Sequence, residues 1–163
     1  MKNSMKLEIK AISLNEAFAR SAVAAFALPL EPTLTELSDI KTAVSEAVTN
    51  CVVHAYSEED DKENRKIIIE CETETKADGG ILHITVTDFG KGIENVERAV
   101  LPFYTTLACE ERSGMGFTIM QTFMTDFSVE SQKGQGVKIK MKKRIGGQAA
   151  ERACRMDGEG VNA

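Results

Sequence analysis

Several kinds of site are missing from this sequence. Its four cysteines form no C-x-x-C pair and have no histidine at metal-ligand spacing, so neither a zinc site nor a disulfide framework is indicated. No apolar run is long enough for a signal peptide or a membrane span. Acidic residues outnumber basic ones by 25 to 20, and the net charge of -5 opposes sequence-independent binding to phosphate backbones. We therefore expect a cytoplasmic protein with reduced thiols that contacts neither membrane nor nucleic acid directly.

The length and composition predict a single domain followed by a tail. A chain of 163 residues with 42% hydrophobic content can bury one continuous core. Patterned sequence continues to about residue 146. Residues 147–163 are small, polar and glycine-bearing, with nothing that could form a buried stripe. We expect one domain over 1–146 and a disordered tail over 147–163.

Local patterns predict both helices and strands. Apolar residues at every third or fourth position predict helices, and strict alternation predicts strands with one wet face. The S-x-x-E or T-x-x-E form at Ser13 and at Thr33 predicts a capped helix start at each. The expected helices are 13–28, 33–56 and 114–124, and the expected strands are 5–12, a segment starting at 67, 81–87, 127–131 and 137–143. This order predicts an α+β fold: a two-layer sandwich with helices on one face of a mixed, mostly antiparallel sheet.

Two polar side chains lie four residues apart on the long predicted helix. Glu46 and Asn50 therefore project from the same helix face, one turn apart. An ordinary surface pair is the simple explanation. The functional alternative assigns the carboxamide oxygen of Asn50 to a magnesium ion, which prefers oxygen ligands, and makes Glu46 a proton acceptor.

The motif D-x-G-x-G directly follows a predicted strand. It places the Asp88 carboxylate at the strand end, and Gly90 and Gly92 allow a ligand to approach the backbone closely. A carboxylate there can accept a hydrogen bond from an exocyclic amine and so select adenine over guanine. An exposed turn is the alternative, because Asp and Gly are common in loops.

The third motif opens the last predicted helix. Ser113, Gly114, Met115 and Gly116 stand where unpaired backbone amides and the helix dipole favour an anion such as a phosphate. A glycine hinge without a ligand is the alternative. The preceding segment, 88–113, shows no sustained period, and so long an irregular segment inside a compact domain indicates a functional lid.

Taken in this order, the three motifs resemble the GHKL superfamily of ATP-binding domains. The resemblance extends further, to the serine-protein kinases that act as anti-sigma factors in spore-forming bacteria. It covers roughly residues 1 to 144 and is densest at three stretches, 15–20, 42–50 and 111–120. The conventional protein-kinase motifs and the G-x-x-x-x-G-K-[ST] loop are both absent, which excludes those two ATP folds.

The resemblance implies a role for each motif residue. Glu46 would act as the base toward the attacking hydroxyl, and Asn50 would bind Mg²⁺. Asp88 would bind the adenine amine of ATP or ADP, in a pocket shaped by Gly90 and Gly92.

The phosphate side of the site follows from the same resemblance. Gly114 and Gly116 would close over the phosphates together with the lid around Thr105 and Thr106. Arg112 would offset charge on the transferring group; the alternative for Arg112 is a solvated lid side chain.

One position departs from the superfamily pattern. Many members carry a threonine just after the final turn glycine, where it reaches the adenine or its bound water. This chain has Val137 there. We expect weaker nucleotide binding or weaker base discrimination as the consequence.

The function implied by the resemblance is partner switching. The chain would phosphorylate a serine of an anti-anti-sigma factor, bind and inhibit a sporulation sigma factor, and work as a homodimer. Two alternatives remain open at this point. One is a binding module that holds nucleotide and sigma factor without transferring phosphate, and the other is the related anti-sigma kinase of the general stress response.

Overall fold

The computed structural model describes residues 2–58, 60–61, 63–77, 79–102 and 114–146. The regular elements are β1 (Lys2–Lys10), α1 (Leu14–Ala27), α2 (Leu34–Asn50), β2 (Lys66–Lys76), β3 (Gly79–Asp88), α3 (Val96–Ala99), α4 (Gly116–Phe123), β4 (Asp126–Ser131) and β5 (Val137–Ile145). A 3-10 turn, Leu28–Leu30, follows α1, and a π-helical turn, Cys51–Ala55, follows α2. The predicted tail, 147–163, lies outside the described residues.

The strands form one five-stranded sheet in the order β1-β2-β3-β5-β4. All four pairings in the described part of the chain are antiparallel, so the sheet is more uniform than the mixed, mostly antiparallel sheet expected. β3 occupies the centre, and its pairing with β2 ends at Ile67 opposite Asp88. The central strand therefore delivers Asp88 to one end of the sheet.

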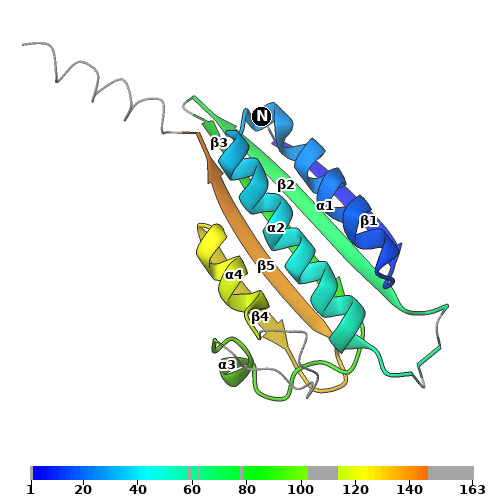
Figure 1. Cartoon of the computed structure of the whole chain (residues 1–163). Coiled ribbons are helices and arrows are strands. Elements are labelled where there is room, and N and C mark those ends of the chain that lie inside the picture. Colours follow the sequence, from blue (N-terminus) through cyan, green and yellow to red (C-terminus); the bar gives the residue numbers. More distant parts are fainter. Residues whose placement is uncertain (1, 59, 62, 78, 103–113, 147–163) are drawn as a thin grey trace, which may run out of the picture.

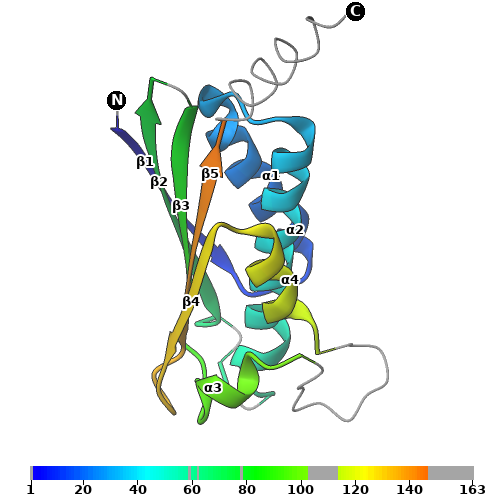
Figure 2. The same ribbon diagram turned by 90° about the vertical axis from the view of Figure 1, so that its left-hand side faces the viewer.

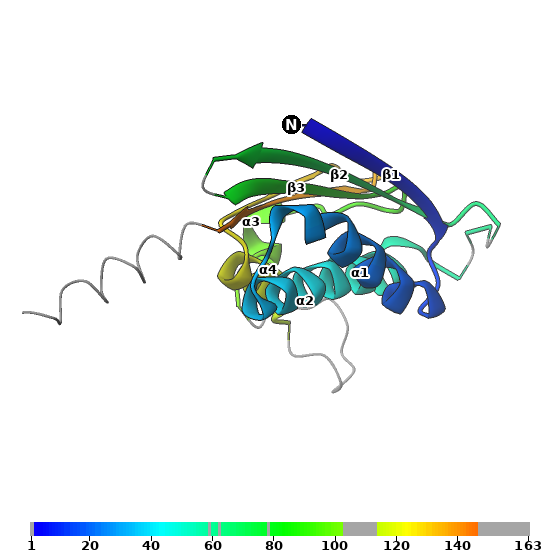
Figure 3. The same cartoon turned by 90° about the horizontal axis from the view of Figure 1, so that it is seen from above.

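The molecule has two layers. Figures 2 and 3 show the sheet as one layer and α1, α2 and α4 as the other, all on the same face. Alternate residues of the strands face the helices and are buried, as Ile67, Ile69 and Cys71 are on β2. The intervening residues of β2 and β5 are charged or half-exposed, which gives the sheet one wet face. The predicted α+β sandwich, with helices on one face of the sheet, is confirmed.

Helix α2 is central to the helical layer, with α1 and α4 on either side of it (Figure 1). Its start is the predicted capping box: Thr33 Oγ1 accepts from the backbone N–H of Glu36, and Glu36 Oε2 accepts from the backbone N–H of Thr33 at 2.8 Å. The capping box predicted at Ser13 is wrong. The Ser13 hydroxyl makes no cap, since the Ser13 backbone is helical (φ −58°, ψ −30°) where a capping residue is normally extended, and the Glu16 carboxylate instead accepts from Arg20 at 2.7 Å and from Thr49 of α2 at 3.3 Å.

The other end of α2 is irregular. The regular helix stops at Asn50, six residues before the end of the helical segment expected from the sequence, and a π-helical turn continues it to Ala55. Tyr56 then takes an extended backbone conformation. π-turns are rare and often occur at functional sites, and this one lies at the cavity described below.

Candidate nucleotide-binding site

The three motifs lie around one cavity of about 890 Å³. It is in the size range of small-molecule sites, and it opens where α2 ends, where β3 ends and where α4 begins. Seven of the predicted site residues line it: Glu46, Asn50, Asp88, Gly92, Gly114, Met115 and Gly116. The fold thus brings Asp88 and Gly114, which lie about 40 and 70 positions after Glu46 in the sequence, to the same site as Glu46.

The start of α4 lies directly against the functional face of α2. A Cβ atom added at Gly116 would lie 3.1 Å from Glu46 Oε2 and 3.4 Å from both Oδ1 and Nδ2 of Asn50. Glu46 and Asn50 therefore point into the cavity toward the helix start, as their four-residue spacing predicts. A side chain at Gly116 would displace one of these two polar groups.

Asp88 is held firmly at the base of the cavity. It is 2% exposed, and its Oδ1 accepts the backbone N–H of Gly90 at 3.0 Å and that of Val137 at 3.2 Å. Both bonds fall on the same oxygen. One carboxylate oxygen is thus occupied by the protein backbone, which fixes the orientation of the other.

Burial governs the electrostatics around Asp88. Desolvation raises the pKa of Asp88 above its usual 3.8, although the N–H groups of Gly90 and Val137 and the thiol of Cys51 act in the opposite direction. Cys51 is also buried, and desolvation, with the negative charge of Asp88 beside it, raises the pKa of its thiol well above 9.0. At neutral pH the thiol is protonated and can donate to the carboxylate.

Two glycines of the D-x-G-x-G motif allow close backbone contacts. A Cβ at Gly90 would lie 1.9 Å from the carbonyl oxygen of Ala55, and one at Gly92 would lie 2.1 Å from that of Gln132. Gly92 also has a positive φ of 72°. Gly90 itself is not among the cavity-lining residues; it instead packs the loop after Asp88 against the end of the π-turn.

The turn between β4 and β5 closes the same loop from the opposite side. The Ser131 hydroxyl accepts from the N–H of Ile93 at 2.8 Å and donates to the carbonyl of Gly136 at 2.6 Å, and the N–H of Gly134 donates to the carbonyl of Lys91 at 2.6 Å. The loop after Asp88 is therefore held between the π-turn and the β4–β5 turn. Val137, which stands where many superfamily members have threonine, lines the cavity with an aliphatic side chain.

Sequence reasoning missed several lining residues. Cys51 and His54 come from the π-turn, and Lys91, Arg98 and Lys133 come from loops and the short helix α3. No motif identifies these residues, because their position depends on how the π-turn and two loops fold together.

Four predicted phosphate-side residues cannot be placed. Thr105, Thr106, Arg112 and Ser113 lie outside the described residues. Within the described ranges no group of three or more His, Cys, Asp and Glu side chains could hold a metal ion. The Asn50 carboxamide nevertheless faces the cavity beside the start of α4, which suits Mg²⁺ because this ion usually takes few protein ligands and binds substrate phosphates as well.

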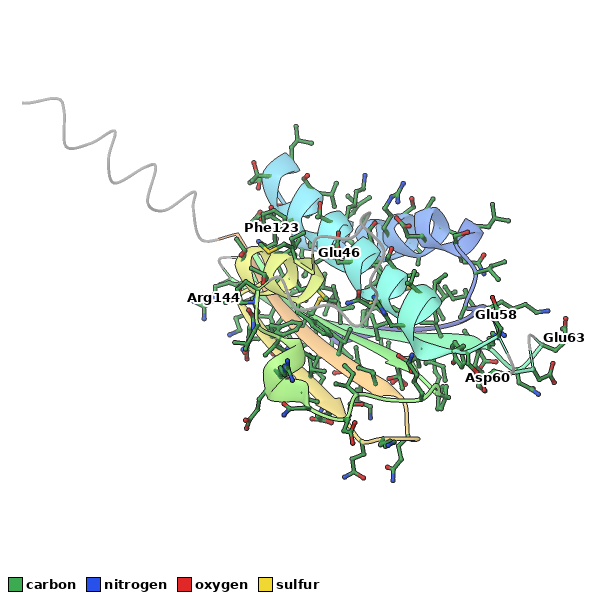
Figure 4. The ribbon with its side chains drawn as sticks, turned by 60° about the horizontal axis from the view of Figure 1, so that its bottom comes forward. Glu46, Glu58, Asp60, Glu63, Phe123 and Arg144 are labelled. Carbon is green, nitrogen blue, oxygen red and sulfur yellow. The ribbon has the colours of Figure 1, made fainter. Side chains whose placement is uncertain are left out.

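The densest acidic segment of the chain lies away from this site. Figure 4 shows Glu58, Asp60 and Glu63 in the loop between the π-turn and β2, well apart from Glu46 on α2. Asp60 is tied locally, accepting from the backbone N–H of Ser57 at 2.6 Å, and this bond lowers the pKa of Asp60. Glu63 accepts from Lys10 at the end of β1 at 2.6 Å, and none of these three acidic residues lines the cavity. None of the helices in the described ranges has the length and apolar character needed to cross a membrane.

Comparison with known proteins places this geometry in a family. Residues 11–143 match the histidine kinase-like ATPase domain. The chain is 53% identical over 144 residues to the anti-sigma F factor of Caldanaerobacter subterraneus subsp. tengcongensis, covering 88% of this chain and 95% of that one. It is 51% identical over 148 residues to the anti-sigma F factor of Clostridium perfringens, covering 89% of this chain and 99% of that one.

Solved structures share the fold at low identity. A structure of the RsbU and RsbW domains of Rv1364c from Mycobacterium tuberculosis matches with a TM-score of 0.59 and 16% identity, over 88% of this chain and 32% of that one. The SiaB-SiaC complex from Pseudomonas aeruginosa matches with a TM-score of 0.55 and 11% identity, over 86% of this chain and 89% of that one. The matched domain and the relatives together show that the chain belongs to the histidine kinase-like ATPase domains and, among these, to the anti-sigma F factor family.

Proposed function

We propose that this chain is an ATP-dependent serine-protein kinase that phosphorylates an anti-anti-sigma factor and that also binds and inhibits a sporulation sigma factor. The observation that carries the proposal is the meeting of Glu46, Asn50 and Gly116 in a cavity whose base is the buried Asp88. A carboxylate at this place supports transfer chemistry over nucleotide binding alone, because it can accept the proton of an attacking hydroxyl.

The cavity suggests how ATP lies in it. Asp88 accepts a hydrogen bond from the exocyclic amine of adenine, through the carboxylate oxygen that the backbone does not occupy. The phosphates then extend toward the backbone amides at the start of α4, where the helix dipole favours negative charge. This orientation brings the γ-phosphate to Glu46 and Asn50.

Phosphoryl transfer depends mainly on positioning and charge compensation. Asn50 would hold Mg²⁺ through its carboxamide oxygen, and the ion would supply positive charge to the phosphates. Glu46 accepts the proton of the attacking serine hydroxyl as the oxygen bonds to the γ-phosphorus and the bond to the β-phosphate breaks. ADP and a phosphoserine are the products.

The names of the relatives support the proposed partners. The name anti-sigma F factor supports a sigma factor as the inhibited partner, and the SiaB-SiaC complex shows that a protein of the same fold binds a second protein, as the proposed phosphorylation requires. In the proposed cycle the unphosphorylated anti-anti-sigma factor displaces the sigma factor, and the phosphorylated form does not. We place this cycle in the cytoplasm and assign it to a homodimer.

Intact-protein mass spectrometry of an anti-anti-sigma factor incubated with the chain, ATP and Mg²⁺ tests the proposal. We expect one added phosphate on a serine, and none with Glu46→Gln. Transfer at the wild-type rate by Glu46→Gln would remove Glu46 as the base. Absence of transfer by wild-type protein that binds ATP would favour a binding module. Transfer only to an anti-anti-sigma factor of the general stress response would change the substrate but not the chemistry.

A further inference from the structure

The Tyr56 hydroxyl occupies an unusual place between two strands. The pairing of β2 with β3 ends at Ile67 opposite Asp88, so Lys66 and Phe89 would form the next pair of an uninterrupted sheet. They do not pair. The Tyr56 hydroxyl stands between them, donating to the carbonyl of Lys66 at 2.6 Å and accepting from the N–H of Phe89 at 3.1 Å and that of Lys66 at 3.3 Å.

These three bonds use the full capacity of a phenol, which has one donor and two acceptor positions. The backbone groups involved are the ones that a direct pairing of Lys66 with Phe89 would use. The arrangement also requires a protonated hydroxyl, and burial raises the pKa of Tyr56 above 10, although the N–H groups of Phe89 and Lys66 act in the opposite direction. The hydroxyl thus replaces one rung of the sheet and keeps the two strands apart at that point.

The separation sets the path of the chain just after Asp88. From Phe89 onward the chain leaves β2 and turns against the end of the π-turn, where the N–H of Lys91 donates to the carbonyl of Ala55 at 2.7 Å. Gly90 packs against the same carbonyl and donates its N–H to Asp88 Oδ1. The path that Tyr56 imposes is therefore the path that brings the Gly90 N–H to the Asp88 carboxylate.

We infer that Tyr56 is a positioning residue for base recognition: its hydroxyl holds β2 and β3 apart so that the loop after Asp88 keeps the carboxylate aimed at the adenine amine. The inference rests on the proposed role of Asp88. Tyr56 lies at the end of the same helical segment that carries Glu46 and Asn50, so one segment would set both the catalytic groups and the base-recognition group.

The test compares nucleotide binding by wild type, Tyr56→Phe and Thr33→Ala. ATP and inosine triphosphate are the two probes, because the second carries a carbonyl oxygen where adenine has its amine. Tyr56→Phe keeps the ring and removes the hydroxyl, which frees Lys66 and Phe89 to pair directly. Thr33→Ala is the matched control, because it also deletes a hydroxyl that makes backbone bonds but does so at the far end of α2.

We expect Tyr56→Phe to bind ATP roughly tenfold more weakly, with inosine triphosphate binding unchanged, so that the preference for ATP falls by the same factor. Thr33→Ala should lower the melting temperature about as much as Tyr56→Phe does, but its preference for ATP over inosine triphosphate should stay that of the wild type. Wild-type preference retained in Tyr56→Phe would overturn the inference and leave the role of Asp88 intact. Absence of any preference in the wild type would instead overturn the role of Asp88 itself.

A second measurement does not require a variant that folds. Amide hydrogen exchange of the wild-type chain should show the Phe89 N–H protected to the same degree as amides inside β3, because the hydroxyl serves it as a sheet partner. Exchange of Phe89 at the rate of an exposed loop would contradict the interposed hydroxyl.

Discussion

The two ends of α2 are built differently. At its start a regular helix begins with a complete capping box at Thr33, and the nearby Asp39 carboxylate accepts from Lys143 of β5 at 2.7 Å. At its other end the helix turns into a π-turn, and buried or half-buried polar groups collect around it, among them Asn50, Cys51 and Asp88. One end thus satisfies its polar groups within the fold, and the other presents polar groups to a cavity.

The difference shows where this fold keeps its irregular features. A π-turn and a buried carboxylate both carry a cost in stability, and both occur beside the cavity. The capped end also holds a buried carboxylate, that of Glu36, but both of its oxygens accept backbone N–H groups, one from Thr33 and the other from Gly146. We therefore expect substitutions at the cavity end to change nucleotide binding and transfer, and substitutions at the capped end to change stability alone.

The largest effect is expected from Glu46→Gln. The amide keeps the size of the side chain but cannot accept the serine proton, so phosphoryl transfer should fall by a factor of about 10² to 10⁴. ATP affinity should stay within a few-fold of the wild type, because the adenine end of the cavity is untouched. Single-turnover transfer and equilibrium binding, measured on the same preparation, separate the two effects.

Asp88→Asn should weaken ATP binding by a factor of about 10 to 100, the usual value of one hydrogen bond to a charged group. The backbone N–H groups of Gly90 and Val137 would hold the amide oxygen, so its NH₂ group would face the adenine amine. Isothermal titration calorimetry measures the change. Undiminished ATP affinity in a folded Asp88→Asn protein would mean that Asp88 does not bind the adenine amine.

Lys143→Met should affect the opposite property. Lys143 is 12% exposed in its side chain, and it donates to Asp39 and to the carbonyl of Phe123 at 2.6 Å, so its loss leaves both acceptors without this partner. We expect the free energy of unfolding to fall by about 1–3 kcal/mol. Urea denaturation gives this value, and ATP affinity at a temperature where the variant is folded should equal that of the wild type.

Thr33→Ala removes the N-terminal cap of α2 and should lower the free energy of unfolding by about 1 kcal/mol. Its ATP affinity should be unchanged. A clear loss of ATP affinity in this variant would contradict the expectation that the capped end of α2 affects stability alone.

The smallest effect concerns pH and is opposite in sign for binding and stability. The raised pKa of Asp88 means that its carboxylate takes up a proton as pH falls through that pKa toward 3.8, and ATP then loses its acceptor. Over the same interval the folded state binds more protons than the unfolded state, so the contribution of Asp88 to stability rises. Asp88→Asn should lack both changes, which separates them from titration of the nucleotide itself.

Much of this molecule can be predicted from the sequence, and the exceptions share a cause. The long helix, the hairpin after residue 66 and the three motifs follow from local periodicity and spacing. The capping box at Ser13 fails in its glutamate half because Arg20 and a residue on another helix bind Glu16. The role of Tyr56 could not be foreseen either, because it depends on the register of two strands that start 10 and 23 residues later in the chain.

Hydrogen exchange with and without ATP and Mg²⁺ tests the division of α2 most directly. We expect slower exchange on nucleotide binding in residues 46–56, 88–93 and 131–137, and no change in residues 34–40. Equal protection along the whole of α2, or protection confined to its capped end, would contradict the account.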